Sequence, residues 1–238
     1  MPHPYATAIV ILAIIWIFCF ESRKDMRKAM VWSGLACVLI LSLTYLALKF
    51  VDTQLIDLGE TMLAGYWNPY TLFNANSAGT GISIIDILFM FFTGGIAAFL
   101  YEYTFGQRFV QTRSRKHHAR ALIVGLLGAI LTGALLKPHP IYLVIAFCIF
   151  GAASIWIERH DLIPHSFWGA AVFTTLYIAL FAMFLQLVPD MAAIQYKLAS
   201  FSGQLILGVP LEHILYAASF GLLWAPLYEY EHGLRLRS

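Results

Sequence analysis

Seven long apolar stretches constrain the fold of this chain more than any other feature of its sequence. A helix needs about 20 apolar residues to cross the hydrocarbon core of a bilayer. Charged residues make up only 12% of the 238 residues, against about 25% in soluble domains. The sequence therefore predicts an all-α membrane protein with seven transmembrane helices. We expect these helices at residues 5–20, 29–49, 83–103, 119–137, 141–157, 166–188 and 209–230.

Neither a cleaved signal peptide nor a disulfide framework is expected. The first apolar stretch lacks a basic start and a small-residue cleavage site, so we interpret it as the first span. Cys19, Cys37 and Cys148 all lie inside apolar stretches. That placement is typical of packing residues and not of a metal site.

Basic residues alternate with the predicted spans. Lys and Arg are concentrated in cytoplasmic loops of membrane proteins. Residues 21–29, 107–120 and 233–238 are basic, whereas residues 51–81 contain three acids and no Lys or Arg. The pattern predicts an external N-terminus and a cytoplasmic C-terminus. An anionic membrane surface accounts for the basic loop at 107–120, so we expect membrane lipid as a partner and no nucleic acid.

The last part of the chain repeats the first part. The segment LYEY ends both the third and the seventh predicted span, where Tyr101 aligns with Tyr228 at a sequence offset of 127. Gly94 aligns with Gly221 at the same offset. Earlier in each half, DMRKAMVW at 25–32 matches DLIPHSFW at 161–168 at an offset of 136. The change of offset indicates a longer loop before the third helix of the first half.

The repeat predicts a domain organisation. We expect a first three-helix repeat at 1–106, a basic loop and linker helix at 107–140, and a second three-helix repeat at 141–238. With the linker helix, both repeats run in the same direction through the membrane. Repeats of this kind place a binding site at their mutual interface.

Ionisable residues mark the outer ends of the two equivalent helices. Glu212 and His213 follow Pro210 at the start of an otherwise apolar stretch, and Asp86 is equivalent to His213. Proline suits a first helical turn, and Asp86 three residues after Ser83 resembles a capping box. Ionisable groups near the membrane are nevertheless functional candidates. At the opposite end, Glu102 and Glu229 suit the membrane interface, where tyrosines flank them. The repeat also allows an inward-facing pair of glutamates.

The proline–glutamate helix start and the duplicated LYEY helix end resemble the lycopene cyclase domain family of integral-membrane proteins. The resemblance extends over nearly the whole chain and includes DLIPHSFWGAAVFTTLYIALF and VPLEHILYAASFGLLW. The family motif has two consecutive glutamates after the proline. Here His213 follows Glu212, and Ile85 precedes Asp86, so neither copy is complete. Between them the two halves retain one acid at each motif position.

The resemblance implies redox-neutral cyclisation of the end group of an acyclic carotenoid, a lyase or isomerase type of reaction without a cofactor. It further implies an integral protein of a prokaryotic cytoplasmic membrane. The chemistry needs a buried acid, a nearby base, and aromatic faces that stabilise a carbocation away from water. We expect Glu212 as the acid and Asp86 or His213 as the base. The remaining predicted substrate contacts are Pro210, Tyr216, Trp224, Tyr66 and Trp67.

The sequence leaves one alternative to the cyclase and argues against four other classes of protein. The incomplete motif also suits a non-catalytic relative that binds an isoprenoid or another lipid. A di-iron enzyme needs many facing histidines, which His117, His118 and the HDLIPH segment do not supply. The last span has no lysine for a retinal Schiff base. A transporter would have a charged residue near the middle of a span, and no predicted span has one. The sequence also lacks the G-x-G-x-x-G motif that would indicate a flavin-dependent enzyme.

Overall fold

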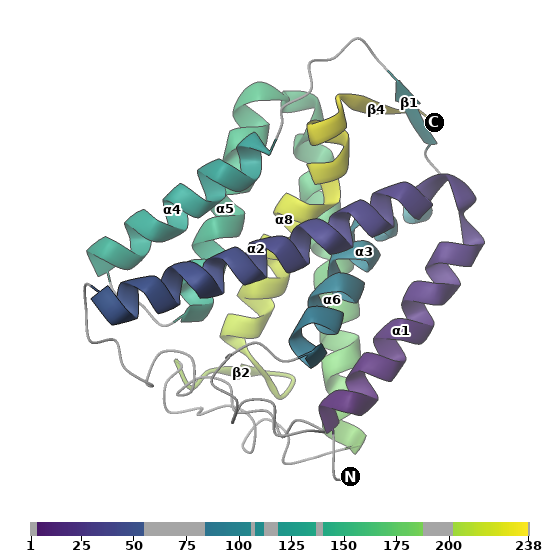
Figure 1. The fold of residues 1–238 in the computed structure, drawn as a ribbon. Coiled ribbons are helices and arrows are strands. Elements are labelled where there is room, and N and C mark those ends of the chain that lie inside the picture. The colour runs from purple at the N-terminus through teal and green to yellow at the C-terminus, as the bar shows by residue number, and fades with distance from the viewer. Residues whose placement is uncertain are drawn as a thin grey trace.

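The computed structural model describes residues 4–54, 84–105, 108–111, 119–136, 140–187 and 202–237. Seven α-helices make up most of these residues and form a bundle (Figure 1). Each of the seven predicted stretches coincides with one helix, with ends that differ by at most five residues. The helices are α1 (Pro4–Ser22), α2 (Arg27–Gln54), α3 (Ile84–Phe105), α4 (Arg120–Leu136), α5 (Pro140–Glu158), α6 (Ile163–Leu187) and α8 (Leu211–His232).

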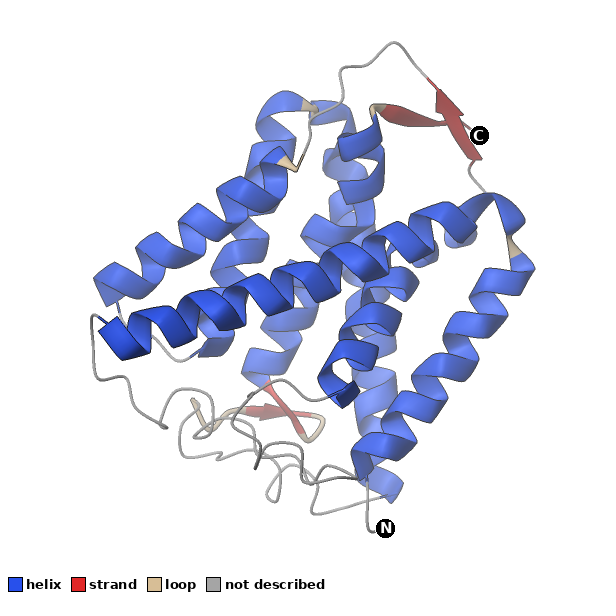
Figure 2. Cartoon of the chain, in the orientation of Figure 1, coloured by secondary structure: helices blue, strands red, loops and turns tan. Residues whose placement is uncertain are grey.

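The described residues are mainly α-helical, as expected, and also contain four short strands. Two small antiparallel sheets lie at opposite ends of the bundle (Figure 2). Strand β1 (Arg108–Gln111) pairs with β4 (Leu234–Arg237), and β2 (Leu205–Ile206) pairs with β3 (Val209–Pro210). Strands as short as these leave no periodic signal in a sequence, so the sequence does not predict them.

Within the described residues, two segments are long and apolar enough to cross a membrane, Ile141–Glu158 and His160–Gln186. A third candidate span consists of Ala6–Ser22 and Lys24–Ile40 taken together, and these two segments meet at a bend of 110°. Helices α3 and α4 contribute shorter apolar segments. The apolar helices therefore identify the chain as an integral membrane protein, with two or three candidate spans among its described residues. The count of seven spans stays a prediction.

Helix α8 occupies the centre of the bundle and packs against α6, α5 and α3. Fifteen of its 22 residues are buried, among them Glu212, His213, Glu229 and Glu231. Because neighbouring helices shield these polar side chains, α8 does not need the uniformly apolar surface of a lipid-exposed helix. The helix ends at Gly233, whose left-handed backbone lets its amide bond the carbonyls of the last turn.

The packing of the first three helices resembles that of the last three. Helix α2 packs along α3 as α6 packs along α8, and α1 contacts α3 as α5 contacts α8. Gly94 and Gly221, which are related by the offset of 127, make the two close approaches. A Cβ atom on Gly94 would lie 2.8 Å from the carbonyl oxygen of Ser33, and one on Gly221 would lie 2.9 Å from that of Gly169. Ser33 and Gly169 are themselves related by the offset of 136.

The turns that precede α2 and α6 have the same construction. In the first, the Arg23 side chain bonds both carboxylate oxygens of Asp25, and in the second Arg159 bonds both oxygens of Asp161. Each arginine leads into a short 3-10 helix, η1 (Lys24–Met26) or η3 (His160–Leu162). The pKa of Arg159 is raised above its ordinary value, first by its hydrogen bond with Asp161. Positions related by the offset of 136 thus share their local geometry.

The β1–β4 sheet joins the two segments that follow α3 and α8. Its pairs include Phe109 with Leu236, two residues that the offset of 127 makes equivalent. The flanking pairs, Arg108 with Arg237 and Val110 with Arg235, exchange with each other when the same offset is applied. The register is therefore the one expected of a pseudo-twofold axis that passes through the sheet.

We predict that Gly221→Ala lowers the stability of the protein. The added methyl group would meet the backbone of Gly169 and Ala170 in α6, and such overpacking costs about 1–3 kcal/mol. Thermal unfolding in detergent, followed by circular dichroism, measures the effect. Gly133→Ala is the matched control, because its Cβ would meet only Leu143 side-chain atoms, the nearer at 3.4 Å. An equal or smaller loss in the Gly221 variant would contradict the close packing of α8 on α6.

Removal of the turn arginines should have unequal effects. Arg159 is 7% exposed and also donates to the Leu234 carbonyl, whereas Arg23 is 19% exposed, and their aspartate partners are equally exposed. Hydrogen bonds of a charged group contribute about 1.5–3 kcal/mol when buried, and exposed ion pairs less than about 1 kcal/mol. Arg159→Ala should therefore lower the melting temperature more than Arg23→Ala. A larger loss for Arg23→Ala would show that the greater burial of Arg159 does not strengthen its ion pair.

Candidate functional site

Glu212 is held in a buried position at the start of α8. Its Oε1 atom accepts a hydrogen bond from the Tyr142 hydroxyl at 3.0 Å and another from the Ser202 backbone amide at 2.7 Å. Its Oε2 atom is buried and has no hydrogen-bond partner among the described residues. Three elements create this arrangement: the first turn of α8, the first turn of α5, and the segment before β2. One carboxylate oxygen is therefore fixed, and the other is left for a further contact.

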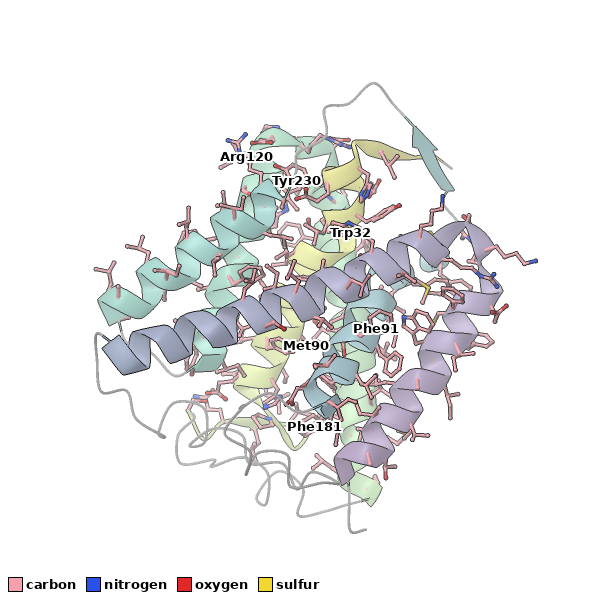
Figure 3. All side chains as sticks on the ribbon, in the orientation of Figure 1. Trp32, Met90, Phe91, Arg120, Phe181 and Tyr230 are labelled. Atoms are coloured by element: carbon pink, nitrogen blue, oxygen red, sulfur yellow. The ribbon has the colours of Figure 1, made fainter. Side chains whose placement is uncertain are left out.

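His213, the next residue, is buried on the α6 side of the same turn. Its Nδ1 atom and the Tyr177 hydroxyl share a hydrogen bond of 2.8 Å. The Phe181 ring lies 5.5 Å from the imidazole, and the Tyr177 ring lies 6.2 Å from it. Figure 3 shows Phe181 at the end of the bundle where α8 begins. The imidazole is thus bordered by aromatic rings and is held in orientation by a phenol.

Three other predicted site residues lie at different positions along α8. Pro210 is buried at the N-cap of α8. Tyr216 lies one turn further along, with its ring 6.1 Å from that of Tyr177, so it borders the site. Trp224 is about 18 Å from Glu212 along the helix, where it stacks on Phe220 and donates to the Ser33 carbonyl.

The structure does not show three further predicted residues in contact with Glu212. Asp86 is half-buried in the first turn of α3, and α3 packs against α8, so Asp86 and Glu212 each begin one of two contacting helices. Their direct approach stays a prediction. Tyr66 and Trp67 lie outside the described residues.

Glu212 and Tyr142 have apolar counterparts in the first half of the chain, whereas His213 corresponds to Asp86. At the two offsets, Glu212 corresponds to Ile85 and Tyr142 corresponds to Ala6. Ile85 packs against Ile9 in a small apolar cluster. The two halves pack alike, but the described structure builds the glutamate–phenol–amide arrangement on α5 and α8, in the second half.

Sequence reasoning did not identify Tyr142, Tyr177 or Ser202. Tyr142 and Tyr177 lie within long apolar stretches, where a tyrosine is indistinguishable from a packing residue. Ser202 contributes through its backbone amide, which no residue type encodes. The one available signal was the offset of 136, because it places a tyrosine in the second half where the first half has Ala6 or Leu41.

A second polar cluster closes the opposite end of the bundle. Glu229 is fully buried, and its carboxylate lies 3.3 Å from His165 Nδ1 of α6. Three further contacts join α8, α5 and the start of α4 to one another. The Tyr230 hydroxyl donates to Glu158 at 2.8 Å, Glu158 forms an ion pair with Arg120, and Glu231 accepts from the Ala119 amide. Arg120 and Tyr230 are labelled at this end in Figure 3. Glu229 is therefore an inward-facing residue and not the membrane-interface residue expected from its flanking tyrosines.

The described side chains do not form a recognisable metal centre. Among them, no group of three or more His, Cys, Asp or Glu residues is arranged to hold a metal ion. His165 is engaged with Glu229, and His160 is exposed. His117 and His118 lie outside the described residues.

The fold and the site define an integral membrane protein of packed helices with a buried acid at the start of its central helix. A family model described as lycopene cyclase matches residues 3–104 and 139–231, which together form most of the chain. The chain therefore belongs to the lycopene cyclase family, as its sequence motifs predict. The two matched regions correspond to α1–α3 and α5–α8, and the segment between them contains α4. Searches of curated proteins and of solved structures returned no match.

Proposed function

We propose that this chain is a carotenoid end-group cyclase that protonates an acyclic polyene from Glu212. Membership in the lycopene cyclase family supports cyclase-like chemistry in general. The observation that carries the specific proposal is the asymmetric environment of the Glu212 carboxylate. Two neutral donors hold Oε1, while the buried Oε2 has no partner among the described residues. A proton on Oε2 would be available to a substrate, and the two donors would stabilise the carboxylate that remains.

The proposed reaction is redox-neutral and conserves all atoms. Glu212 transfers its proton to the terminal C=C bond of the polyene, which leaves a tertiary carbocation. The electron pair of a neighbouring C=C bond then forms the ring C–C bond and moves the positive charge to a ring carbon. Loss of a proton from an adjacent carbon to His213 or Asp86 restores a double bond. Return of that proton to Glu212 closes the cycle without a metal or nucleotide cofactor.

The surroundings of His213 suit a carbocation. Aromatic rings attract positive charge over their faces, by about 0.5–2 kcal/mol each. Tyr177, Phe181 and Tyr216 supply such rings around the first two turns of α8. Because Glu212 and His213 are both buried, water that would quench a cation is kept away.

The proposed topology has seven spans, an external N-terminus and a cytoplasmic C-terminus. In Figure 1, α1, α3, α5 and α8 run in one direction and α2, α4 and α6 run in the other. The turns at Arg23 and Arg159 and the β1–β4 sheet then lie at one end, together with most of the basic residues. Positive charge favours the cytoplasmic side, so the Glu212 site belongs to the outer end. The proposal includes a prokaryotic cytoplasmic membrane and two three-helix repeats joined by α4.

A non-catalytic isoprenoid-binding role is the second candidate. It is favoured by the replacement of the second motif glutamate by His213 and by the presence of Ile85 and Ala6 in the first half. Cells that accumulate lycopene and express the unmodified chain discriminate between the two functions. Formation of cyclic carotenoid supports the cyclase, and its absence despite membrane-inserted protein supports the binding role.

Glu212→Gln should abolish ring formation. The amide keeps the size of the side chain and an oxygen that can accept from Tyr142 and Ser202, but it cannot donate the required proton. Positioned acids contribute about 100-fold to 10,000-fold to a rate, so cyclic product should fall by at least about 100-fold. Chromatography of pigments from lycopene-accumulating cells measures the product. Equal membrane levels of both proteins are the control, and undiminished product would exclude Glu212 as the acid.

Tyr142→Phe should reduce activity without abolishing it. The variant loses the phenol that donates to Glu212 Oε1, whereas the Ser202 amide remains. A hydrogen bond to a charged group contributes about 1.5–3 kcal/mol, which corresponds to a decrease of about 10-fold to 100-fold. Initial rates in reconstituted vesicles provide the measurement. Tyr103→Phe, at an exposed position on α3, is the control, and equal rates for the two variants would count against a role for Tyr142.

A further inference from the structure

The hairpin before α8 exposes an unusual run of aliphatic side chains. Leu205, Ile206 and Leu207 are 53%, 48% and 77% exposed. No charged residue occurs between Ser202 and Leu211. The hairpin lies at the end of the bundle where α8 begins (Figure 1). A water-exposed turn normally has polar residues at such positions, so this apolar tip requires an explanation.

The backbone conformation of the turn disfavours a leucine at position 207. Ile206 pairs with Val209, which leaves Leu207 and Gly208 as a two-residue loop, and both have positive φ angles, 53° and 80°. Loops of this type strongly favour Asn, Asp or Gly, because a side chain with a Cβ is strained there. Gly208 meets the requirement, with the Leu185 side chain of α6 beside it. Leu207 does not, and its exposure means that packing within the protein offsets little of the strain.

The base of the same hairpin is bonded to the acid site. The Ser202 amide donates to Glu212 Oε1 at 2.7 Å, and the Leu211 amide donates to the Gln204 carbonyl at 2.9 Å. Val209 and Pro210 are buried between the tip and the first turn of α8. The position of the tip and the position of the Ser202 amide are therefore mechanically connected.

We propose that the tip formed by Leu205, Ile206, Leu207 and Gly208 inserts into the lipid leaflet at the Glu212 end of the protein and thereby holds the Ser202 amide on Glu212. The occupant of this apolar surface is the acyl-chain region of the bilayer, since the tip is uncharged and extends from helices of a membrane protein. Insertion is shallow, because the Leu207–Gly208 peptide groups are not paired in the sheet and unpaired amides are costly in hydrocarbon. A depth of about 5–10 Å, at the headgroup–acyl boundary, lets the aliphatic side chains contact lipid while the peptide groups stay hydrated.

A single fluorescent label tests the insertion. Cys19, Cys37 and Cys148 are buried, so Leu207→Cys can be labelled with an environment-sensitive fluorophore in the otherwise unmodified chain. In phosphatidylcholine–phosphatidylglycerol vesicles we expect blue-shifted emission, weak quenching by iodide, and strong quenching by lipids spin-labelled near the headgroup. Lipids labelled near the chain end should quench less. Gln204→Cys at the exposed hairpin base is the matched control and should be readily quenched by iodide.

Two results would overturn the insertion. One is equal iodide quenching at positions 204 and 207 without quenching by spin-labelled lipid. The other is self-quenching of the label at 207 that disappears on dilution of the protein in lipid, which would assign the surface to a second copy of the chain. Neither measurement depends on activity. If the proposed cyclase function fails, the insertion stands or falls separately.

Leu207→Asn tests the connection to the acid site, which rests on the proposed function. Asparagine relieves the strain of the turn, so the melting temperature in detergent should stay the same or rise. In vesicles, however, the loss of the lipid contact should lower the rate of cyclisation several-fold, because the Ser202 amide is no longer held on Glu212. A variant of equal or greater stability with an unchanged rate would overturn the holding role. A less stable variant would overturn the account of strain at Leu207.

Discussion

The structure depends on the burial of the polar side chains of α8 away from lipid. Helix α8 has four acidic or imidazole side chains buried along its length, and an unpaired charge in a bilayer costs several kcal/mol. The surrounding helices can approach closely enough only because α8 presents Gly221 and α6 presents small residues to it. Close backbone packing of this kind is a main attractive force between helices in lipid. The buried acid at the start of α8 is therefore a consequence of how tightly α8 is enclosed.

The two ends of α8 surround their buried acids with different partners. At one end Glu229 lies against His165 and within the electrostatic reach of Arg159, and the neighbouring Glu158 is paired with Arg120. Arginine and histidine side chains beside these carboxylates thus connect the helices at this end. At the other end the Tyr142 hydroxyl and the Ser202 amide, both neutral, hold Glu212. The described hydrogen-bond partners of Glu212 thus carry no charge, in contrast to the partners at the other end.

Much of the fold could be predicted from the sequence, because helix positions in a membrane depend mainly on the length of apolar stretches. The approximate bounds of the seven helices, the family and the place of Glu212 at the start of α8 were accessible in this way. The aromatic and polar neighbours of Glu212 were not. Tyr142 and Tyr177 lie far from Glu212 along the chain, and their contact depends on the rotation of α5 and α6 about their axes, which an almost uniformly apolar helix does not reveal. The short strands were missed because their pairing is set by neighbouring helix ends.

Two similarly packed halves, of which the second has the glutamate–phenol–amide arrangement among the described residues, have a consequence for a substrate that is itself symmetrical. A polyene with two identical ends presents both of them to a protein in which, on the proposed chemistry, one half carries Ile85 and Ala6 where the other carries Glu212 and Tyr142. On that chemistry, an end would be cyclised only when it reaches Glu212. Cyclisation of both ends would then require the polyene to rebind in the reversed orientation, with the monocyclic carotenoid as an intermediate.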